Sequence, residues 1–356
     1  MAEADRSVLE AWRERIATAA RSGTPLRLRG AGTKDFYGEN LAGEVMELRG
    51  WCGIVDYEPS ELVISVRSGT PLSEVEAALA AHDQFLAFEP PAFGADPTIG
   101  GVIAAGLSGP RRMFAGAARD FVLGTRLLTA QGEALRFGGK VMKNVAGFDV
   151  SRLLCGSLGI LGILTEVSLK VLPRPRVEET RRLELSAGEA VATFNRWAAL
   201  PLPLSGAAWS QGGAWVRLSG APAAVRAARE QIGGDPVAAS LADRFWSDLR
   251  HCQLPLFAAE SVWRLSLPPA APPPDIPVEP LIDWGGALRW YANVPPEIAV
   301  RERARALQGT ALHWRGAEPG GRFHPLPATV ASLHRRLKER FDPGGLFNPG
   351  RLIAGL

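Results

Sequence analysis

The stretch Arg29-Gly30-Ala31-Gly32-Thr33-Lys34 has the residue types of an anion-binding loop. It follows an alternating segment, Leu26 to Leu28, that is typical of a strand. Backbone amides of successive small residues can converge on an anion, and glycine permits the positive φ angles that this requires. The spacing matches neither the nucleoside-triphosphatase P-loop nor the Rossmann fingerprint. The loop therefore predicts a phosphate group held in another way, and an ordinary turn between strands is the alternative.

Two further glycine-rich segments follow in the chain. In "DPTIGG", the pair Gly100-Gly101 would let the backbone lie flat against a planar ligand, with the Thr98 hydroxyl as a donor. In "GSLGILGI", three glycines recur at every third position, where only backbone can approach a ligand closely. The alternative for the first of these segments is tight packing of a helix on a strand, and the glycine spacing of the second is by itself a weak signal. The three segments in this order predict a large, phosphate-containing ligand.

The composition excludes several other classes of protein. The net charge of +3 in 356 residues, without a Lys/Arg tract, does not favour nucleic-acid binding. No apolar run reaches the roughly 18 residues of a membrane span, and the N-terminus has no signal-peptide pattern. Cys52, Cys155 and Cys252 are far apart, so the chain has no iron–sulfur or zinc spacing, and a reduced cytoplasmic location is expected. The five histidines show no metal-binding spacing either, so no metal site is predicted.

The elements that must position these loops indicate an α+β fold in two domains. A helix over residues 8–21 precedes the first strand, and "FVLGTRLLTAQGEALRFGG" predicts a hairpin turning at Gln131-Gly132. "ILGILTEVSLKVLP" is typical of a long buried strand. After residue 175 strands and helices continue around a proline-rich loop, "LPPAAPPPDIPVEP". We predict domains at 1–175 and 176–325, and a C-terminal helix and tail at 326–356.

The glycine-rich segments resemble a known family. "RGAGTK", "PTIGG" and "GFDVSRLLCGSLGILGILTEVSLKVLP" are similar to the FAD-binding domain of the vanillyl-alcohol oxidase type, also called PCMH-type. "FDPGGLFNPGRL" resembles the C-terminal segment with which D-2-hydroxyacid oxidoreductases of that family return to the flavin. Longer blocks, "GPRRMFAGAARDFVLGTR" and "GGKVMKNVAGFD", are similar to flavin-binding subunits of bacterial glycolate oxidases. The resemblance runs from about Thr24 to Leu352. It implies a PCMH-type FAD domain, a smaller α+β cap and a C-terminal segment returning to the flavin.

The resemblance also implies which residues bind the FAD. The pyrophosphate would be held by Arg29, Gly30, Ala31, Gly32, Thr33 and Lys34. The isoalloxazine and ribityl side would lie along Pro97, Thr98, Gly100 and Gly101. The adenine end or the pyrophosphate would be approached by Gly156, Ser157, Gly159, Gly162 and Ile163. Asn348 would return to the flavin edge, and Lys143-Asn144 would support the flavin. Because these segments contain no histidine, we expect a non-covalent FAD.

The sequence departs from the catalytic members of the family at the substrate site. It lacks their His-rich metal motif, and His313 and His324 are interpreted as surface or fold-supporting residues. Arg289, in "WGGALRW", is the candidate contact for a substrate carboxylate, since its planar fork matches a carboxylate. The alternative is a structural arginine stacked between Trp284 and Trp290. Arg111-Arg112 would meet an anionic substrate or a partner subunit.

The resemblance implies a role within a complex. The chain would be the FAD-binding subunit of an enzyme that oxidises glycolate to glyoxylate, with hydride transfer from the α-carbon to a flavin. Its implied partners are a larger FAD-linked subunit and an iron–sulfur subunit that passes electrons to an acceptor such as quinone. The complex would associate peripherally with the inner membrane from the cytoplasm. The alternatives are a self-sufficient D-2-hydroxyacid dehydrogenase and a non-catalytic structural or assembly subunit.

Overall fold

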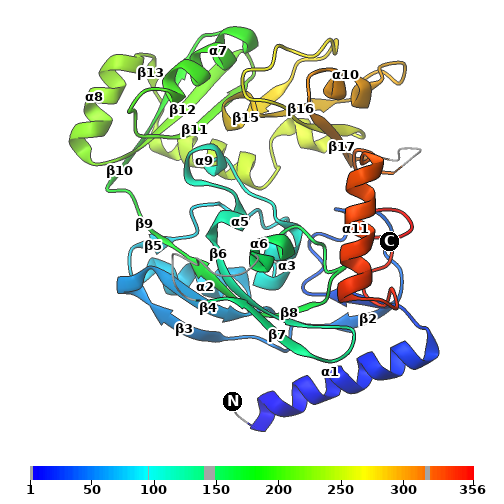
Figure 1. Cartoon of the computed structure of the whole chain (residues 1–356). Coiled ribbons are helices and arrows are strands. Elements are labelled where there is room, and N and C mark those ends of the chain that lie inside the picture. Colours follow the sequence, from blue (N-terminus) through cyan, green and yellow to red (C-terminus); the bar gives the residue numbers. More distant parts are fainter. Residues whose placement is uncertain (1–2, 95, 140–148, 317–320) are drawn as a thin grey trace.

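The computed structural model describes residues 3–94, 96–139, 149–316 and 321–356, and it has two lobes (Figure 1). The first lobe is built on a five-stranded antiparallel sheet in the order β3-β4-β8-β6-β7. Its strands are β3 (Ile54–Glu58), β4 (Val63–Arg67), β6 (Val122–Leu128), β7 (Ala134–Gly138) and β8 (Ile163–Lys170). Its helices are α2 (Leu72–Ala80), α3 (Ile99–Ala105), α4 (Arg112–Ala115), α5 (Ala118–Phe121) and α6 (Val150–Leu154), with a 3-10 turn at Pro59–Glu61. The predicted hairpin at Gln131-Gly132 joins β6 to β7.

A small parallel pair lies beside this sheet. β1 (Leu26–Arg29) pairs with β2 (Glu44–Glu47), and α1 (Glu3–Ser22) packs next to them. The first helix is confirmed, although it begins upstream of the predicted residue 8. Trp12 and Ile16 of α1 share an apolar cluster with Leu26 and Phe347, because their helical spacing puts both on one face. A second short pair joins β5 (Gln84–Phe85) to β9 (Leu172–Pro173).

The second lobe contains an eight-stranded sheet in the order β13-β10-β12-β11-β15-β16-β14-β17. Its strands are β10 (Val177–Leu183), β11 (Leu204–Ser210), β12 (Gly213–Gly220), β13 (Asp235–Pro236), β14 (Val262–Ser266), β15 (Leu281–Asp283), β16 (Leu288–Ala292) and β17 (Thr310–Arg315). Its helices are α7 (Ala187–Ala198), α8 (Pro222–Ile232), α9 (Ala239–Arg250) and α10 (Val300–Ala306), with 3-10 turns at Pro255–Ala258 and Trp284–Gly286. The proline-rich segment between β14 and β15 is a loop, as the sequence predicts.

The last helix, α11 (Ala328–Phe341), lies beside the first lobe, and the chain then turns back towards β1 (Figure 1). Lys338 fixes this return, since its buried ammonium donates to Ile160 O (2.8 Å), Phe347 O (2.7 Å) and the Asp342 carboxylate (2.6 Å). The predicted boundaries at residues 175 and 325 fall between β9 and β10 and between β17 and α11. The predicted architecture, an α+β flavin-type domain, a cap and a returning tail, is confirmed.

A buried ion cluster joins the two lobes. Glu89, which precedes α3, accepts hydrogen bonds from Arg111 (3.0 Å) in the first lobe and from Arg217 (2.9 Å) on β12. Arg111 also pairs with Glu178 on β10. Since these side chains are mostly buried, the cluster fixes how the cap sits on the first lobe. In the described part of the chain, no helix is long and apolar enough to cross a membrane.

Candidate functional site

The loop after β1 presents a row of backbone amides. Within the described residues, the amides of positions 30–34 donate no hydrogen bond to another group of the chain. Gly32 has φ +73°, a conformation that glycine adopts without strain. Free amides at consecutive positions, with one glycine in the left-handed region, form the concave arrangement that binds anions. The loop therefore has the geometry that its sequence predicts.

The three glycine-rich segments meet at this loop. A Cβ on Gly30 would overlap the hydroxyl of Thr98, so these two segments touch only because Gly30 has no side chain. A Cβ on Gly100 would lie 2.7 Å from Ser68 Cβ. A Cβ on Gly159 would lie 2.7 Å from Asn348 Nδ2. These glycines let distant segments of backbone form one cradle.

Two small cavities adjoin in the cradle, with volumes of about 70 and about 90 Å³. Both are smaller than a pocket for a whole small-molecule ligand, so the cradle as it stands would enclose only part of one. The residues that line only the first cavity include Ser68, Gly100, Gly159 and Gly162. Those that line only the second include Arg29, Ala31, Gly32, Thr33, Lys34 and Pro97. Gly30, Thr98, Gly101, Leu158 and Asn348 line both.

Ser68 is a site residue that the sequence reasoning missed. Its side chain is buried, and Ser68 Oγ has no hydrogen-bond partner among the described residues. A buried hydroxyl without a partner is costly unless a ligand or water satisfies it. The serine lies directly after β4, in "SVRSGTP", and its carbonyl accepts a hydrogen bond from the Gly100 amide (2.7 Å), so the two segments meet directly. An oxygen-rich ligand in the cradle fits this hydroxyl.

The charges around the cradle also fit an anion. Burial lowers the pKa of Lys34 to about 8, which a nearby anion would oppose. Arg29 is less available, because it pairs with Glu47 (3.2 Å) and lies 3.6 Å from Asp35. Arg351, from the returning tail, donates to the carbonyls of Lys34 (3.1 Å) and Asp35 (2.9 Å) and so shapes the loop from behind.

Asn348 does return to the cradle, but its side-chain amide binds backbone. Its Oδ1 accepts from the Leu28 amide (2.7 Å), and its Nδ2 donates to Leu158 O (2.7 Å). The residue therefore ties the third glycine segment and the tail to β1. Its contribution is to hold the cradle together.

Three predicted residues line neither cavity. Ile163 starts β8, and its buried side chain belongs to the apolar cluster of α1, so that prediction is corrected to a core role. Gly156 allows close packing, because a Cβ on Gly106 would lie 2.9 Å from Gly156 Cα. Ser157 is buried beside it. Gly156 therefore packs against the C-terminal end of α3, and neither residue lines the cradle. Lys143-Asn144 lies outside the described residues.

The proposed substrate contact of Arg289 is wrong on geometric grounds. Its side chain is only 1% exposed, and it donates to Gly286 O (3.2 Å), Pro272 O (2.8 Å) and Ala271 O. The alternative, a structural arginine, is confirmed, but it does not stack between Trp284 and Trp290, because neighbouring residues in a strand point to opposite faces. Arg289 instead holds the proline-rich loop against the sheet.

The tryptophan stacking belongs to Arg264. This residue lies opposite Trp290 in the β14–β16 pair, and its guanidinium is 5.2 Å from the Trp284 ring and 5.6 Å from the Trp290 ring. The Arg112 guanidinium also lies over Trp284, 4.1 Å from the centroid of its ring. Arg111 is engaged in the ion cluster between the lobes.

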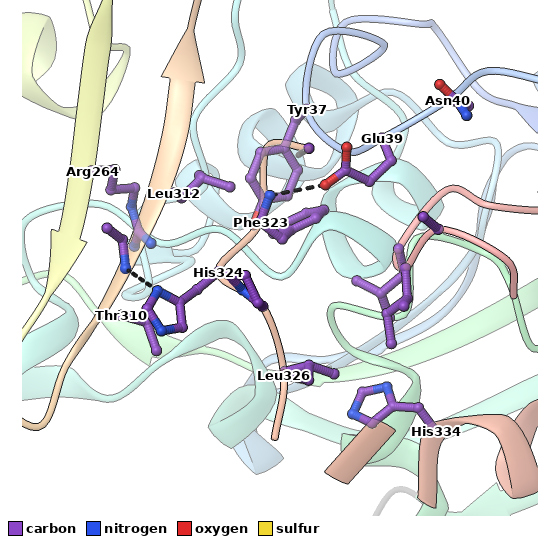
Figure 2. Close-up of a pocket in the computed structure, with 16 residues that line it drawn as sticks. Tyr37, Glu39, Asn40, Arg264, Thr310, Leu312, Phe323, His324, Leu326 and His334 are labelled. Atoms are coloured by element: carbon purple, nitrogen blue, oxygen red, sulfur yellow. Dashed lines mark hydrogen bonds between the residues drawn. The ribbon is translucent and has the colours of Figure 1, made fainter. Parts of the chain in front are cut away.

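The two histidines of interest have different surroundings. His313 is 2% exposed and its Nε2 is 3.0 Å from Ser261 Oγ, which confirms a fold-supporting role. His324 lines a cavity of about 700 Å³ that is larger than the cradle (Figure 2). Among the described residues, no group of His, Cys, Asp or Glu could hold a metal ion.

Comparison with known proteins defines the class first. Residues 9–138 match the model of the FAD binding domain. The structure of alkyldihydroxyacetonephosphate synthase superposes with a TM-score of 0.65 at 15% identity, covering 96% of this chain and 75% of that chain. The protein therefore has the fold of the vanillyl-alcohol oxidase type. It is a flavoprotein of the oxidoreductase class that binds FAD.

Sequence relatives then narrow the family. The glycolate oxidase subunit GlcE of Escherichia coli K12 is 47% identical over 344 residues, which cover 96% of this chain and 97% of GlcE. The glycolate oxidase subunit GlcD of Bacillus subtilis 168 is 33% identical over 158 residues, 44% of this chain and 33% of GlcD. The chain belongs to the family of the glycolate oxidase subunit GlcE.

Proposed function

We propose that this chain is the FAD-binding subunit of a complex that oxidises glycolate to glyoxylate. The observation that carries the proposal is the cradle of free amides, glycine contacts and an unpartnered Ser68 hydroxyl, in a chain similar along almost its whole length to a glycolate oxidase subunit. The pyrophosphate would lie on the amides of residues 30–34. Ser68 and Thr98 would donate to neighbouring oxygens.

Bound FAD would supply the acceptor for the two electrons that glycolate loses, together with two protons, when it becomes glyoxylate. The chain's own contribution is positioning. Lys34 would place positive charge beside the phosphates, and Asn348 and Arg351 would keep the loop in its binding shape. The lack of a histidine in the cradle motifs supports a non-covalent flavin.

Electron exit would require a partner. The three cysteines are separate, and the described residues offer no cluster of metal ligands. We propose that a larger FAD-linked subunit and an iron–sulfur subunit complete the enzyme and deliver electrons to an acceptor such as quinone. The complex would then associate with the cytoplasmic face of the inner membrane through those partners.

The test is co-expression of this chain with the candidate partners and purification through a tag on this chain. We expect both partners to co-purify, with flavin and iron present in fixed ratio and glycolate-dependent reduction of dichlorophenolindophenol. The chain alone should reduce the dye poorly. Dye reduction by the chain alone at the rate of the complex would instead support a self-sufficient dehydrogenase. A complex that keeps full activity when this chain carries no flavin would support an assembly role.

A further inference from the structure

The cavity of about 700 Å³ lies where several distant segments meet (Figure 2). Tyr37 and Glu39 come from the segment that follows the anion-binding loop, Arg264 from β14, and Leu312 from β17. His334 of α11 and the C-terminal tail complete its wall. Its volume is in the range of small-molecule sites, roughly 300 to 1,000 Å³. Unlike the two cavities of the cradle, it is large enough to hold a complete organic ligand.

Arg264 gives this cavity an uncompensated positive charge. Within the described part of the chain, its guanidinium forms no ion pair with a carboxylate, and its hydrogen bond is a long one to Ser266 Oγ (3.4 Å). The rings of Trp284 and Trp290 lie close to it and make cation–π contacts. Burial lowers the pKa of Arg264, which indicates that its charge is poorly solvated.

Nearby acidic groups do not balance this charge. Asp283 interacts with Arg264 electrostatically, but burial raises the pKa of Asp283 to about 7, and its Oδ1 accepts from the Trp284 amide (2.7 Å). Glu39 also lines the cavity as a carboxylate, but it forms no ion pair with Arg264 among the described residues, and its Oε1 is directed to the amides of Arg322 (2.7 Å) and Phe323 (2.9 Å). Arg112, on the same indole as Arg264, adds a second cation. The local charge therefore favours an anionic ligand.

The remaining lining suits an organic anion. His324 Nδ1 accepts a hydrogen bond from the Ala311 amide (3.3 Å), so a neutral His324 carries its proton on Nε2 as a further donor. Burial and two nearby arginines lower the pKa of His324, which favours the neutral form. Leu312, Phe323 and Leu352 supply apolar surface. A planar guanidinium can bind a carboxylate through two hydrogen bonds, and the apolar walls would contact the hydrocarbon part of the same ligand.

We propose that this cavity is a binding site for an organic carboxylate, with Arg264 as its charged contact. It adjoins the flavin cradle, because Arg351 lines the cradle and donates to the carbonyl of Tyr37, while Leu352 and Tyr37 line the cavity. The residues that would bind the carboxylate all belong to this chain, so the proposed site does not depend on a partner subunit. Its use for glycolate, or for another carboxylate that acts on the same enzyme, rests on the proposed function.

The test uses the purified flavin-loaded chain and 2-hydroxyisobutyrate, which resembles a 2-hydroxy acid but has no hydrogen on the carbon that would be oxidised. Calorimetric titration should detect binding of this acid, while its neutral amide should bind at least tenfold more weakly. The comparison of the acid with its amide is made on the wild-type chain. Arg264→Gln should weaken binding of the acid at least tenfold, and Arg264→Lys should retain part of it. Arg335→Gln, on the exposed face of α11, is the matched control and should bind like the wild type.

Flavin content and melting temperature of each variant separate loss of the site from loss of folding. In the assembled complex, a raised KM for glycolate in Arg264→Lys would assign the site to the substrate. An unchanged KM with weakened binding of the acid would assign it to a second carboxylate. Equal binding of acid and amide, no binding of the acid, or full binding by a folded Arg264→Gln chain would overturn the proposal. Failure of the proposed function would appear separately, as a chain without flavin or partners.

Discussion

Asn348 Oδ1 accepts a hydrogen bond of 2.7 Å from the amide of Leu28, a residue 320 positions earlier in the chain. The same side chain donates to Leu158 O (2.7 Å), in the third glycine-rich segment. One amide group therefore joins the first strand, the glycine segment and the returning tail. Its φ of +43° is one that asparagine tolerates better than most residues.

Asn348→Asp should destabilise the fold and weaken flavin binding. The aspartate keeps the acceptor for Leu28 but loses the donor to Leu158 and adds negative charge beside the proposed phosphate site. Leaving a buried acceptor unsatisfied costs about 1–3 kcal/mol of unfolding free energy. Urea denaturation and flavin titration would measure both effects. Asn293→Asp, also at positive φ (+49°) but exposed, is the matched control. Equal stability and flavin affinity in the two variants would contradict the bridging role.

Gly32→Asp should abolish flavin binding while the chain stays folded. The change adds a carboxylate to the anion-binding loop, on the side of Arg29, whose guanidinium lies 2.7 Å from the Cβ position. There it would take up a cation that lines the cradle, and like charges near 4 Å repel by roughly 1–4 kcal/mol. The φ of +73° adds backbone strain. Gly212→Asp, at φ +70° with no atom near its Cβ position, controls for that strain. The flavin-to-protein ratio after gel filtration is the measurement, and a normal ratio in Gly32→Asp would contradict the phosphate placement.

Glu89→Gln should loosen the junction between the lobes. It removes the carboxylate that Arg111 and Arg217 share, and breaking a buried pair this way costs about 3–5 kcal/mol. Glu44→Gln removes a partner from an exposed pair with Arg15 (3.7 Å) and should cost at most about 1 kcal/mol. Denaturant unfolding of both variants would measure the loss of unfolding free energy in each. Similar losses would show that the ion cluster does not hold the lobes.

Asp283→Asn should stabilise the protein increasingly as the pH rises. Burial raises the pKa of Asp283 to about 7 from 3.8, so the unfolded chain releases its proton first. The wild type therefore loses up to about 1.4 kcal/mol of stability per pH unit between those values, a loss that asparagine avoids. Asn keeps the acceptor for the Trp284 amide. Unfolding free energies measured from pH 4.5 to 7.5 should diverge from the wild type. A constant difference between variant and wild type would show that Asp283 titrates normally.

The cradle could be predicted from the sequence because glycine spacing reports directly on close backbone contacts. Gly30, Gly100 and Gly159 all meet another segment where a Cβ would collide. Ser68 could not be predicted, since its place beside Gly100 depends on a contact between the segment after β4 and the start of α3, 32 positions further along the chain.

Arg264 and Arg289 illustrate the same limit in the cap. Arg289 stands next to Trp290 in the sequence, but strand alternation turns it to the opposite face. Arg264 is 26 positions away from Trp290 and lies directly opposite it once β14 pairs with β16. The sequence alone does not specify which strands are neighbours, so it favoured the wrong arginine.

Acid precipitation of the purified chain tests the central claim most directly. The chain should carry close to one FAD per polypeptide, and trichloroacetic acid should leave all of the flavin in the supernatant, where chromatography identifies it as FAD. A chain that stays colourless after incubation with FAD would contradict the cradle as a flavin site. Flavin that stays on the precipitated protein would contradict non-covalent binding.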